Sequence, residues 1–264
     1  MTLRVAIEGI SFWAPRLPGW DIARAVILGE QAPPETPSPR PSPTLLAPTE
    51  RRRAPDTVAV ALEVAVRACE ASGRKPSDLP SVFASTHGDL AISDYMCSTL
   101  ATTPTLISPV KFHNSVHNAA AGYWSIGTGS LAPYTAISAY ESTFGEGLVE
   151  AATQVVCENR PVLYVAFDIE AKGALSTMAP SRGLLGAALV LAPVIQSQQQ
   201  RSLILTTESV AECQPTPARS AAAPLVADNA LAPCLPFFEV LASSSPRTLC
   251  LALSRNTALN VQVN

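Results

Sequence analysis

Two of the chain's three histidines and a serine stand close together in the segment ISPVKFHNSVHNAAAGYWSIGTGS, residues 107–130. His113 and His117 are four residues apart, a spacing that would place both rings on one face of a helix, as two ligands of a metal ion require. No Asp or Glu stands nearby in the sequence to supply a third ligand or a base. Ser115 has no G-x-S-x-G turn around it. We therefore expect neither a metal site nor a triad, and interpret these polar residues as interface anchors or as caps of the following helix.

A second candidate is the junction AISAYESTFGEGLVEAA, residues 136–152. A residue held between a strand end and a helix N-terminus projects into a cleft and feels the positive end of the helix dipole, which is the usual environment of an activated nucleophile. The junction offers Tyr140 and Glu141. Neither accepts an acyl group well, and the helix N-terminus would keep the glutamate in its charged form.

Two weaker signals lie near these segments. Gly127 and Gly129 have part of the spacing of a phosphate-binding loop, but no strand precedes them, so we interpret them as a turn before Pro133. His87 follows a predicted strand, and functional residues of α/β proteins gather at the carboxyl ends of strands. We interpret His87 as a turn residue bonded to the backbone, with a functional role as the alternative.

These residues are positioned by strands and helices that alternate along the chain. Runs of β-branched and aromatic residues predict strands at 3–13, 81–86, 133–138, 161–168, 186–194, 202–210 and 248–254. Longer apolar or amphipathic runs predict helices at 21–28, 56–72, 91–101, 118–126, 142–159 and 235–242. The alternation indicates an α/β domain with a largely parallel sheet covered by helices.

Some details of this organisation are more specific. Asp56 or Thr57 should cap the helix 56–72 and Gly73 should end it. Because no helix separates the strands 186–194 and 202–210, they are expected to form an antiparallel hairpin at the sheet edge. The strand 248–254 should close the chain. We expect a single domain over 1–264.

Two segments predict irregular structure. Residues 31–50 hold seven of the chain's 24 prolines, which remove backbone donors and disfavour helix, so an extended, mobile loop is expected there. The Ala- and Pro-rich stretch 211–230 is also predicted to be irregular.

Composition excludes several classes of protein. With 47% hydrophobic residues the chain can bury a core, and its net charge of −3, with 18 scattered basic residues, argues against a nucleic-acid partner. The six cysteines lie far apart without a CxxC pair, which predicts reduced, mostly buried thiols. No secretion signal and no apolar run of membrane-spanning length occurs, so we expect a cytoplasmic protein without a membrane span.

Three stretches of the chain together resemble β-ketoacyl synthases of the thiolase fold. They are SPVKFHNSVHNAAAGYWSIGTGS, AISAYESTFGEGLVEAA and GAALVLAP, and RVAIEGISFWAP and LPSVFASTHGD support them. The resemblance runs from residue 3 to about 195 and is closest to the short chain length factors of aryl polyene and xanthomonadin-type pigment biosynthesis. It implies the N-terminal half of a thiolase fold, an α/β unit with a mixed, mostly parallel sheet covered by helices.

The resemblance also implies that this chain lacks the synthase's catalytic residues. A true synthase has its nucleophilic cysteine at the start of the buried helix that follows AISA, where this chain has Glu141 or, one residue earlier, Tyr140. A synthase also takes two histidines from its C-terminal half, whereas this chain has no histidine after His117. No catalytic residue, cofactor or metal is expected.

In condensing enzymes, the segment similar to residues 108–130 lies against the partner subunit and the neighbouring active site. The resemblance therefore implies a partner interface formed by His113, Asn114, Ser115, His117 and Asn118. It likewise implies that the acyl tunnel or its gate is formed by residues clustered around the helix start, namely Phe112, Tyr140, Glu141 and Phe144.

The function implied is that of a catalytically inactive chain length factor. It would form a heterodimer, or a higher-order assembly, with a complete β-ketoacyl-ACP synthase, meet the acyl carrier protein through that partner, and shape the acyl tunnel of polyene biosynthesis. Its apolar face, continuous with the helix 56–72, would stay soluble only when covered. The alternative is an enzyme acting alone on acyl thioesters, either a decarboxylase assisted by Glu141 or a hydrolase using Ser115 and His87.

Overall fold

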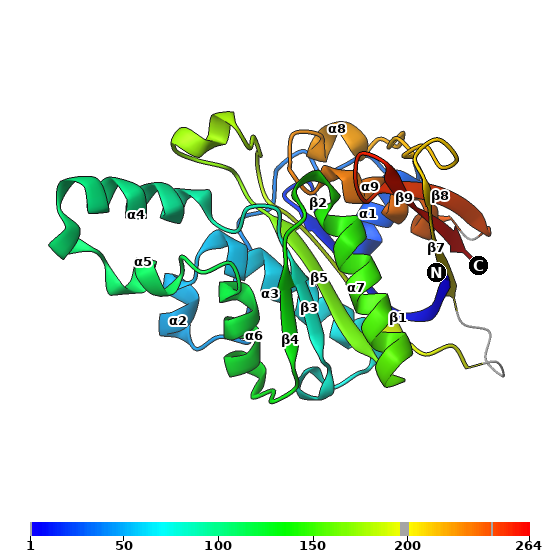
Figure 1. The fold of residues 1–264 in the computed structure, drawn as a ribbon, viewed down its shortest axis with the longest axis horizontal. Helices are drawn as coiled ribbons and strands as arrows, with labels where there is room; N and C mark the ends of the chain where they lie inside the picture. Colours follow the sequence, from blue (N-terminus) through cyan, green and yellow to red (C-terminus); the bar gives the residue numbers. More distant parts are fainter. Residues whose placement is uncertain (1, 196–200, 244) are drawn as a thin grey trace.

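The computed structural model describes residues 2–195, 201–243 and 245–264, and these form one nine-stranded sheet with helices on both faces (Figure 1). The strands are β1 (Thr2–Ala14), β2 (Leu17–Pro18), β3 (Ser81–Ala84), β4 (Tyr134–Ile137), β5 (Val162–Asp168), β6 (Leu185–Ala192), β7 (Ser202–Ser209), β8 (Arg247–Ala252) and β9 (Thr257–Val263). The order is β4-β3-β5-β6-β1-β7-β9-β8, with β2 paired to β1.

The helices follow the predicted pattern with some additions. They are α1 (Trp20–Ile27), α2 (Pro48–Arg53), α3 (Asp56–Ser72), α4 (Leu90–Thr102), α5 (Pro109–His113), α6 (Ala119–Thr128), α7 (Thr143–Glu158), α8 (Ala223–Val226) and α9 (Leu235–Ala242). Gly73 ends α3 in the left-handed conformation, as expected. The expected N-cap of α3 at Asp56 or Thr57 is wrong, because the N-cap is Pro55 and no side chain caps the helix.

The mixed, helix-covered sheet is confirmed, but the expected excess of parallel pairs is wrong. Parallel pairing is confined to β4-β3-β5, and every other pair among the described strands is antiparallel. The parallel region is nevertheless the part that matters for a site, because the carboxyl ends of β3, β4 and β5 meet at one edge of the sheet.

Strand β1 joins two parts of the sheet. Its residues 6–7 and 9–13 pair with β6, with a bulge at Glu8, while residues 2–6 pair with β7. The predicted hairpin of β6 and β7 is therefore wrong, since β1 lies between them and both run antiparallel to it. Periodicity alone does not contain strand order, so the missing helix between these strands was a misleading signal.

The two faces of the sheet carry separate hydrophobic cores. On one face α3 packs on β1, β5 and β6, with α6 beside it, and on the other α7 packs on β5, β1 and β3 (Figure 1). A Cβ on Gly9 would lie 2.2 Å from the carbonyl oxygen of Ala68, so glycine permits the close approach of α3 to β1. Helix α3 is buried within its own chain, so an apolar face that needs covering by a partner has to come from other elements.

The C-terminal region extends the sheet and covers part of one face. Strands β7, β9 and β8 continue the sheet beyond β1, and α9 contributes Phe237 and Phe238 to the core that also holds α7. The expectation that 248–254 is the last strand is wrong, because β9 follows it. The stretch 211–230 is irregular apart from the short α8, and 31–50 is irregular up to α2, which the proline content did not predict.

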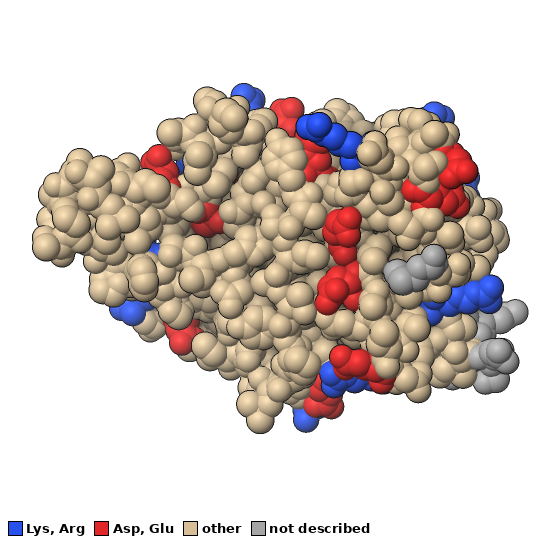
Figure 2. Space-filling view, in the orientation of Figure 1, with Lys and Arg blue, Asp and Glu red and all other residues tan. Residues whose placement is uncertain are grey.

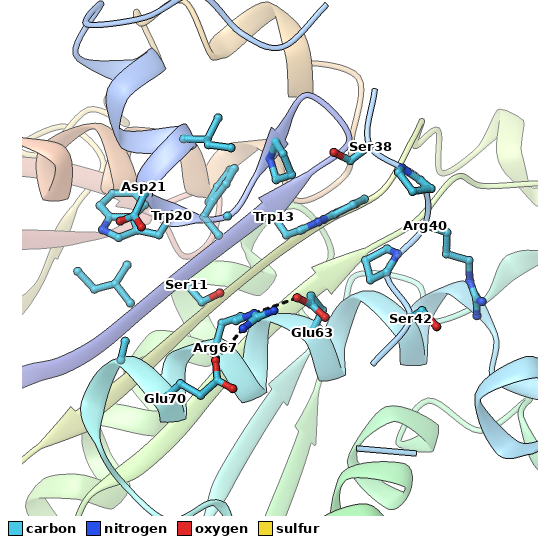
Figure 3. Close-up of a pocket in the computed structure, with 18 residues that line it drawn as sticks. Ser11, Trp13, Trp20, Asp21, Ser38, Arg40, Ser42, Glu63, Arg67 and Glu70 are labelled. Atoms are coloured by element: carbon cyan, nitrogen blue, oxygen red, sulfur yellow. Dashed lines mark hydrogen bonds and ion pairs between the residues drawn. The ribbon is translucent and has the colours of Figure 1, made fainter. Parts of the chain in front are cut away.

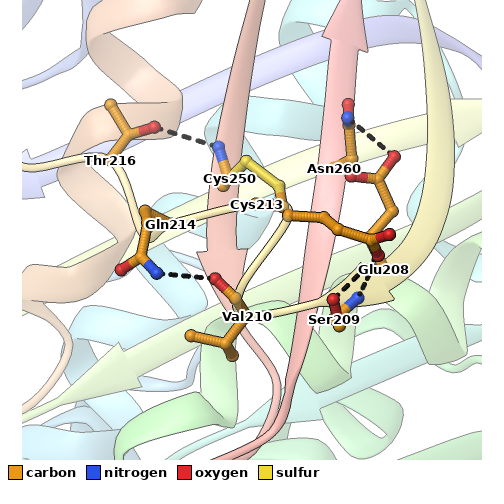
Figure 4. The surroundings of a disulfide bond; sticks show 9 residues. Glu208, Ser209, Val210, Cys213, Gln214, Thr216, Cys250 and Asn260 are labelled. Atoms are coloured by element: carbon orange, nitrogen blue, oxygen red, sulfur yellow. Dashed lines mark hydrogen bonds between the residues drawn. A yellow bond between two sulfur atoms is a disulfide. The ribbon is translucent and has the colours of Figure 1, made fainter.

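A disulfide bond crosslinks this C-terminal region. Cys213 and Cys250 are bonded, with their Cα atoms 5.6 Å apart, and Thr216 bonds to the backbone of Cys250 beside them (Figure 4). The expectation of six reduced thiols is therefore wrong for this pair. Of the four free cysteines, Cys69 and Cys234 are buried.

Candidate functional site

A buried carboxylate lies where the parallel strands end. Asp168 is the last residue of β5, and Ser85 and Thr86 follow the neighbouring β3. The Ser85 hydroxyl donates to Oδ1 of Asp168 at 2.8 Å, and the Thr86 amide donates to its two oxygens at 3.0 and 3.1 Å. Asp168 thus ties the ends of two strands together.

Burial raises the pKa of Asp168 above its usual value, because the low-dielectric interior disfavours the charged form. The hydrogen bonds from Thr86 and Ser85 and the nearby His87 oppose this shift but do not cancel it. A buried polar group whose hydrogen bonds are satisfied in this way is typical of a structural role, here holding the ends of β3 and β5 together. It is also the kind of perturbed carboxyl that marks functional sites.

Tyr140 holds an unusual backbone conformation at the neighbouring junction. It begins a short 3₁₀ helix, Tyr140–Ser142, between β4 and α7, with φ 51°, in the left-handed region that disfavours side chains. The Thr143 hydroxyl donates to the Tyr140 carbonyl at 2.7 Å and accepts from the Ala139 amide at 3.0 Å, which fixes the turn. In this strained turn Tyr140 is 56% exposed to solvent.

The ring of Tyr140 meets the ring of His87 edge-on, with centroids 6.4 Å apart. The two side chains come from the ends of different strands, so the β4-α7 junction and the β3 turn face one another. The Ser138 hydroxyl strengthens this link by donating to the Thr86 carbonyl at 2.9 Å. His87 lies in the bend after β3, as expected, but its ring makes no hydrogen bond to the backbone of the described residues and contacts the Tyr140 ring.

The four residues expected around the tunnel occupy different environments. Glu141 is exposed next to Tyr140, whereas Phe144 is buried in the core, with its ring 5.6 Å from Tyr164 and 5.5 Å from Phe237. Phe112 lies on α5 and is 63% exposed. Within this chain, these four residues are therefore split between a core position, an exposed turn and an exposed helix.

The two histidines of the first segment are not on one helix face, because α5 ends at His113. His113 packs edge-on against Tyr123, with centroids 6.0 Å apart. His117 places Nε2 2.8 Å from the carbonyl oxygen of Ser85, which connects this segment to the strand ends. Among the described residues no three His, Cys, Asp or Glu side chains are close enough together to hold a metal ion.

The remaining polar residues of this segment are held locally. The Ser115 hydroxyl donates to the Phe112 carbonyl at 2.8 Å, so it is engaged in a turn. Asn118 precedes α6 without capping it through its side chain and instead donates to the Tyr134 hydroxyl at 3.1 Å. Asn114 is buried, and its Oδ1 has no partner within the described chain.

Thiol chemistry is absent from the junction in the part of the chain that the structure describes. The free cysteines lie in α3, in α4, at the end of α7 and just before α9, at positions 69, 97, 157 and 234. Burial raises the pKa of Cys69 to about 12, which keeps that thiol protonated. The junction therefore offers a phenol, an exposed carboxylate and an imidazole.

An apolar arm projects beside this site. We use the name for residues 90–131, which contain α4, α5 and α6; α4 and α5 extend from one end of the molecule, and α6 joins them to the body beside α3 and β4 (Figure 1). Between Asp94 and Glu141 the sequence contains one charged residue, Lys111. Figure 2 shows this end of the molecule as an almost uncharged surface. Its exposed apolar side chains are Leu100, Leu106, Val110, Phe112, Val116, Ile126 and Leu131.

Two cavities flank the contact between His113 and Tyr123. One, of about 310 Å³, lies toward α2 and is also lined by Val110, and the other, of about 340 Å³, is lined by Phe112. Ile126 borders both and is 70% exposed. Exposed apolar side chains beside hollows of this size are the features of a surface that another protein covers.

Sequence reasoning missed Asp168 and the extent of the arm. The position of Asp168 at the end of a predicted strand was the available signal for it, as it was for His87. The long interval without charge between Asp94 and Glu141 could have shown the arm. No helix in the described part of the chain has the length and apolar character needed to cross a bilayer.

The chain matches one family model, described as β-ketoacyl synthase, N-terminal domain, over residues 28–242. No curated protein is significantly similar to it in sequence.

Solved structures show the same fold at low sequence identity. A chain from the complex of the ketosynthase ApeO with its chain length factor ApeC from Xenorhabdus doucetiae aligns with TM-score 0.74 and 22% identity, over 98% of this chain and 99% of that one. A chain from the ishigamide ketosynthase/chain length factor aligns with TM-score 0.69 and 15% identity, over 99% of both. The ketosynthase from module 6 of the bacillaene synthase of Bacillus subtilis 168 aligns with TM-score 0.56 and 13% identity, over 84% of this chain but 44% of that one.

Proposed function

The chain belongs to the β-ketoacyl synthase N-terminal domain family, and from this premise we propose that it is a non-catalytic chain length factor that pairs with a complete ketosynthase. One observation carries the proposal. The strained turn at the start of α7, where the family resemblance expects the nucleophilic cysteine, has Tyr140 in the left-handed position and Glu141 after it. A phenol and a carboxylate at this position cannot form the acyl thioester on which condensation depends.

The position of Tyr140 favours it over Glu141 as the replacement for the cysteine. A nucleophile at such a junction is presented by a strained backbone, and the strained residue is Tyr140. Its ring, packed near His87, would fill the space in which an acyl group attaches in an active synthase. Glu141 would add a negative charge at the mouth of that space.

The apolar arm supports a protein partner. Its exposed side chains and its near absence of charge suit an interface that stays covered, because obligate interfaces resemble a hydrophobic core cut in two. The polar residues expected at the interface lie within the arm, from the last residue of α5 to the residue before α6, and are His113, Asn114, Ser115, His117 and Asn118. We propose that the arm and the adjacent edge strand β4 form the contact with the ketosynthase.

Control of chain length would act through the arm. Phe112 is exposed on α5 in this chain, so it is free to extend into a cavity of the partner. We propose that Phe112 closes the end of the partner's acyl tunnel, that Tyr140 and Glu141 form its gate at the start of α7, and that Phe144 supports this start from the core. A bulky ring at a tunnel end limits the chain that the tunnel accepts.

The pathway and setting are proposed on the resemblance. The similarity to a chain from the ApeO/ApeC complex agrees with a role in polyene biosynthesis of the aryl polyene type. The growing chain would be carried by an acyl carrier protein that docks on the ketosynthase, in the cytoplasm. The chain itself needs no cofactor in this scheme.

The proposal is tested by reconstituting condensation from purified parts. The ketosynthase alone, this chain alone and both together are supplied with acyl- and malonyl-loaded acyl carrier protein, and products are measured by mass spectrometry. We expect no condensation by this chain alone and products of defined length only from the pair. Phe112→Ala should lengthen the products, and thioester turnover by this chain alone would contradict the proposal.

A further inference from the structure

The apolar arm contains a single cation. Lys111 is the one charged residue between Asp94 and Glu141, and it is exposed on α5 between the exposed side chains of Val110 and Phe112. The surface at this end of the molecule is otherwise almost uncharged (Figure 2). A protein that covers the arm must therefore also accommodate an ammonium group.

The ammonium group of Lys111 is held in place by an aromatic ring. Its Nζ lies 3.7 Å from the centre of the Tyr95 ring, which belongs to the neighbouring helix α4. The Tyr95 hydroxyl accepts from the Ser108 amide at 3.0 Å and donates to the Leu106 carbonyl at 3.4 Å, so the ring itself is fixed to the segment before α5. A cation over an aromatic face is attracted by the electron density of the ring. The contact therefore keeps a flexible lysine side chain in one orientation.

Lys111 has no anionic partner among the residues that the structure describes, because no carboxylate there lies within ion-pair distance of it. Cations on other helices are paired. Arg67 of α3, for example, bonds to Glu63 at 3.1 Å and to Glu70 at 2.9 Å beside a cleft along β1 (Figure 3). The aromatic ring carries no net charge, so Lys111 can still receive a carboxylate on the side away from the ring.

Covering the arm makes this lone charge unfavourable unless it is paired. An ammonium group is strongly hydrated, and moving it from water into an interface without a counter-charge costs free energy. The Tyr95 ring offsets only part of that cost, because a cation–π contact is weaker than the hydration that is lost. A carboxylate at the facing position would offset the rest. Since complementary charges at an interface act strongly on which partner is accepted, the pair would also confer selectivity.

We propose that Lys111 determines the selectivity of the arm by pairing with the carboxylate of an Asp or Glu on the ketosynthase. This inference rests on the proposed function, because it states the chemistry that the arm requires of that partner. The pair would lie beside Phe112 and fix where its ring enters the partner. A ketosynthase without an acidic residue at the facing position would bind this chain weakly.

A zero-length crosslink tests the pair directly. The chain, the ketosynthase and the acyl carrier protein are mixed and treated with a carbodiimide, which joins an amine to a carboxylate only where the two are in contact. Mass spectrometry then identifies the linked peptides. The chain has lysine only at positions 75, 111 and 172, so each product can be assigned. We expect Lys111 to be joined to one Asp or Glu of the ketosynthase.

Substitutions measure what the pair contributes to binding, by surface plasmon resonance with immobilised ketosynthase. Lys111→Met keeps a long apolar side chain but leaves the partner's carboxylate unpaired, and it should weaken binding about tenfold or more. Lys111→Glu places two negative charges together and should weaken binding further. Replacing the crosslinked carboxylate of the ketosynthase by lysine should restore binding to Lys111→Glu.

A matched control reverses a cation far from the arm. Arg247 is exposed on β8, at the opposite edge of the sheet from β4, and has no ion pair among the described residues. Arg247→Glu changes the net charge of the chain as Lys111→Glu does. We expect it to bind the ketosynthase as the natural chain does, which separates a local ion pair from an effect of overall charge.

The inference is overturned if Lys111→Glu binds as tightly as the natural chain, if Arg247→Glu weakens binding equally, or if the lysine exchange on the ketosynthase does not restore binding. A crosslink from Lys111 to the acyl carrier protein, with none to the ketosynthase, would also overturn it. These results leave the proposed function standing, because the natural chain still binds the ketosynthase in each of them. A natural chain that does not bind contradicts the proposed function, and this inference with it.

Discussion

The ring of Tyr140 lies edge-on to the ring of His87, with centroids 6.4 Å apart, and it does so from a left-handed backbone position. This relationship joins the turn after β3 to the start of α7. The turn that we propose as the counterpart of the synthase's nucleophile position is therefore occupied by an aromatic contact.

The strain at Tyr140 predicts an unusual order of stabilities. Glycine adopts a φ of 51° freely, whereas a β-branched residue pays the full steric cost, so Tyr140→Gly should be more stable than Tyr140→Val by about 1–2 kcal/mol. Urea unfolding measures the difference. Tyr134, in the extended strand β4, is the matched control, and there the valine variant should be the more stable of the two. The same order at both positions would contradict the left-handed turn.

The buried carboxyl of Asp168 predicts a dependence of stability on pH. Its pKa in the folded chain is raised by burial, so between the unfolded value of about 3.9 and the folded value the folded state binds more protons. Its contribution to the free energy of unfolding should therefore decrease as pH rises through the folded pKa. Asp168→Asn cannot titrate, so its deficit relative to the natural chain should be largest below the unfolded pKa of about 3.9 and smaller at pH 8. Chemical denaturation at several pH values tests this, and a deficit that grows with pH would contradict it.

The apolar arm predicts that a single charge will break the proposed complex. Ile126→Lys places a cation between the two arm cavities, and burying it without a partner should weaken binding to the ketosynthase by about 2 kcal/mol or more, roughly thirtyfold. Surface plasmon resonance with immobilised ketosynthase measures the change. Val156→Lys, at an exposed apolar position on α7, is the control and should bind normally. Equal loss in both variants would show that the arm is not the contact.

The disulfide predicts a measurable loss of stability on reduction. Cys213 and Cys250 close a loop of 37 residues, and opening such a loop should lower the free energy of unfolding by about 2–4 kcal/mol. Thermal unfolding with and without dithiothreitol tests this, with Cys213→Ser as a variant that should not respond to the reductant. Thiol titration in denaturant should find four reactive groups before reduction and six after it. Six groups in the unreduced protein would contradict the bond.

The sequence predicts the long elements well because their signals are local. The helix 56–72 and the helix 235–242 agree with α3 and α9 at both ends, since apolar runs and end signals lie within the segments themselves. The pairing of β1 with both β6 and β7 was not predictable in this way, because it depends on contacts between residues 173 to 204 positions apart. The Cys213–Cys250 bond was missed for the same reason.

The candidate site was predictable in its location but not in its geometry. The junction at Tyr140 and Glu141 was recognised from the strand-helix pattern, yet only the backbone φ distinguishes which of them is strained. The family resemblance implied Phe144 as a tunnel residue, while its packing against Phe237 depends on α9, more than ninety positions away. Side-chain roles at such a site follow from tertiary contacts that periodicity does not encode.

Pairing with a ketosynthase is tested most directly by the mass of the assembly that this chain forms. The chain is co-expressed with a ketosynthase from the same genome and separated by size-exclusion chromatography with mass detection. We expect a complex with equal numbers of the two subunits, and we expect Ile126→Lys to dissociate it. A stable monomer that remains apart from the ketosynthase would contradict it.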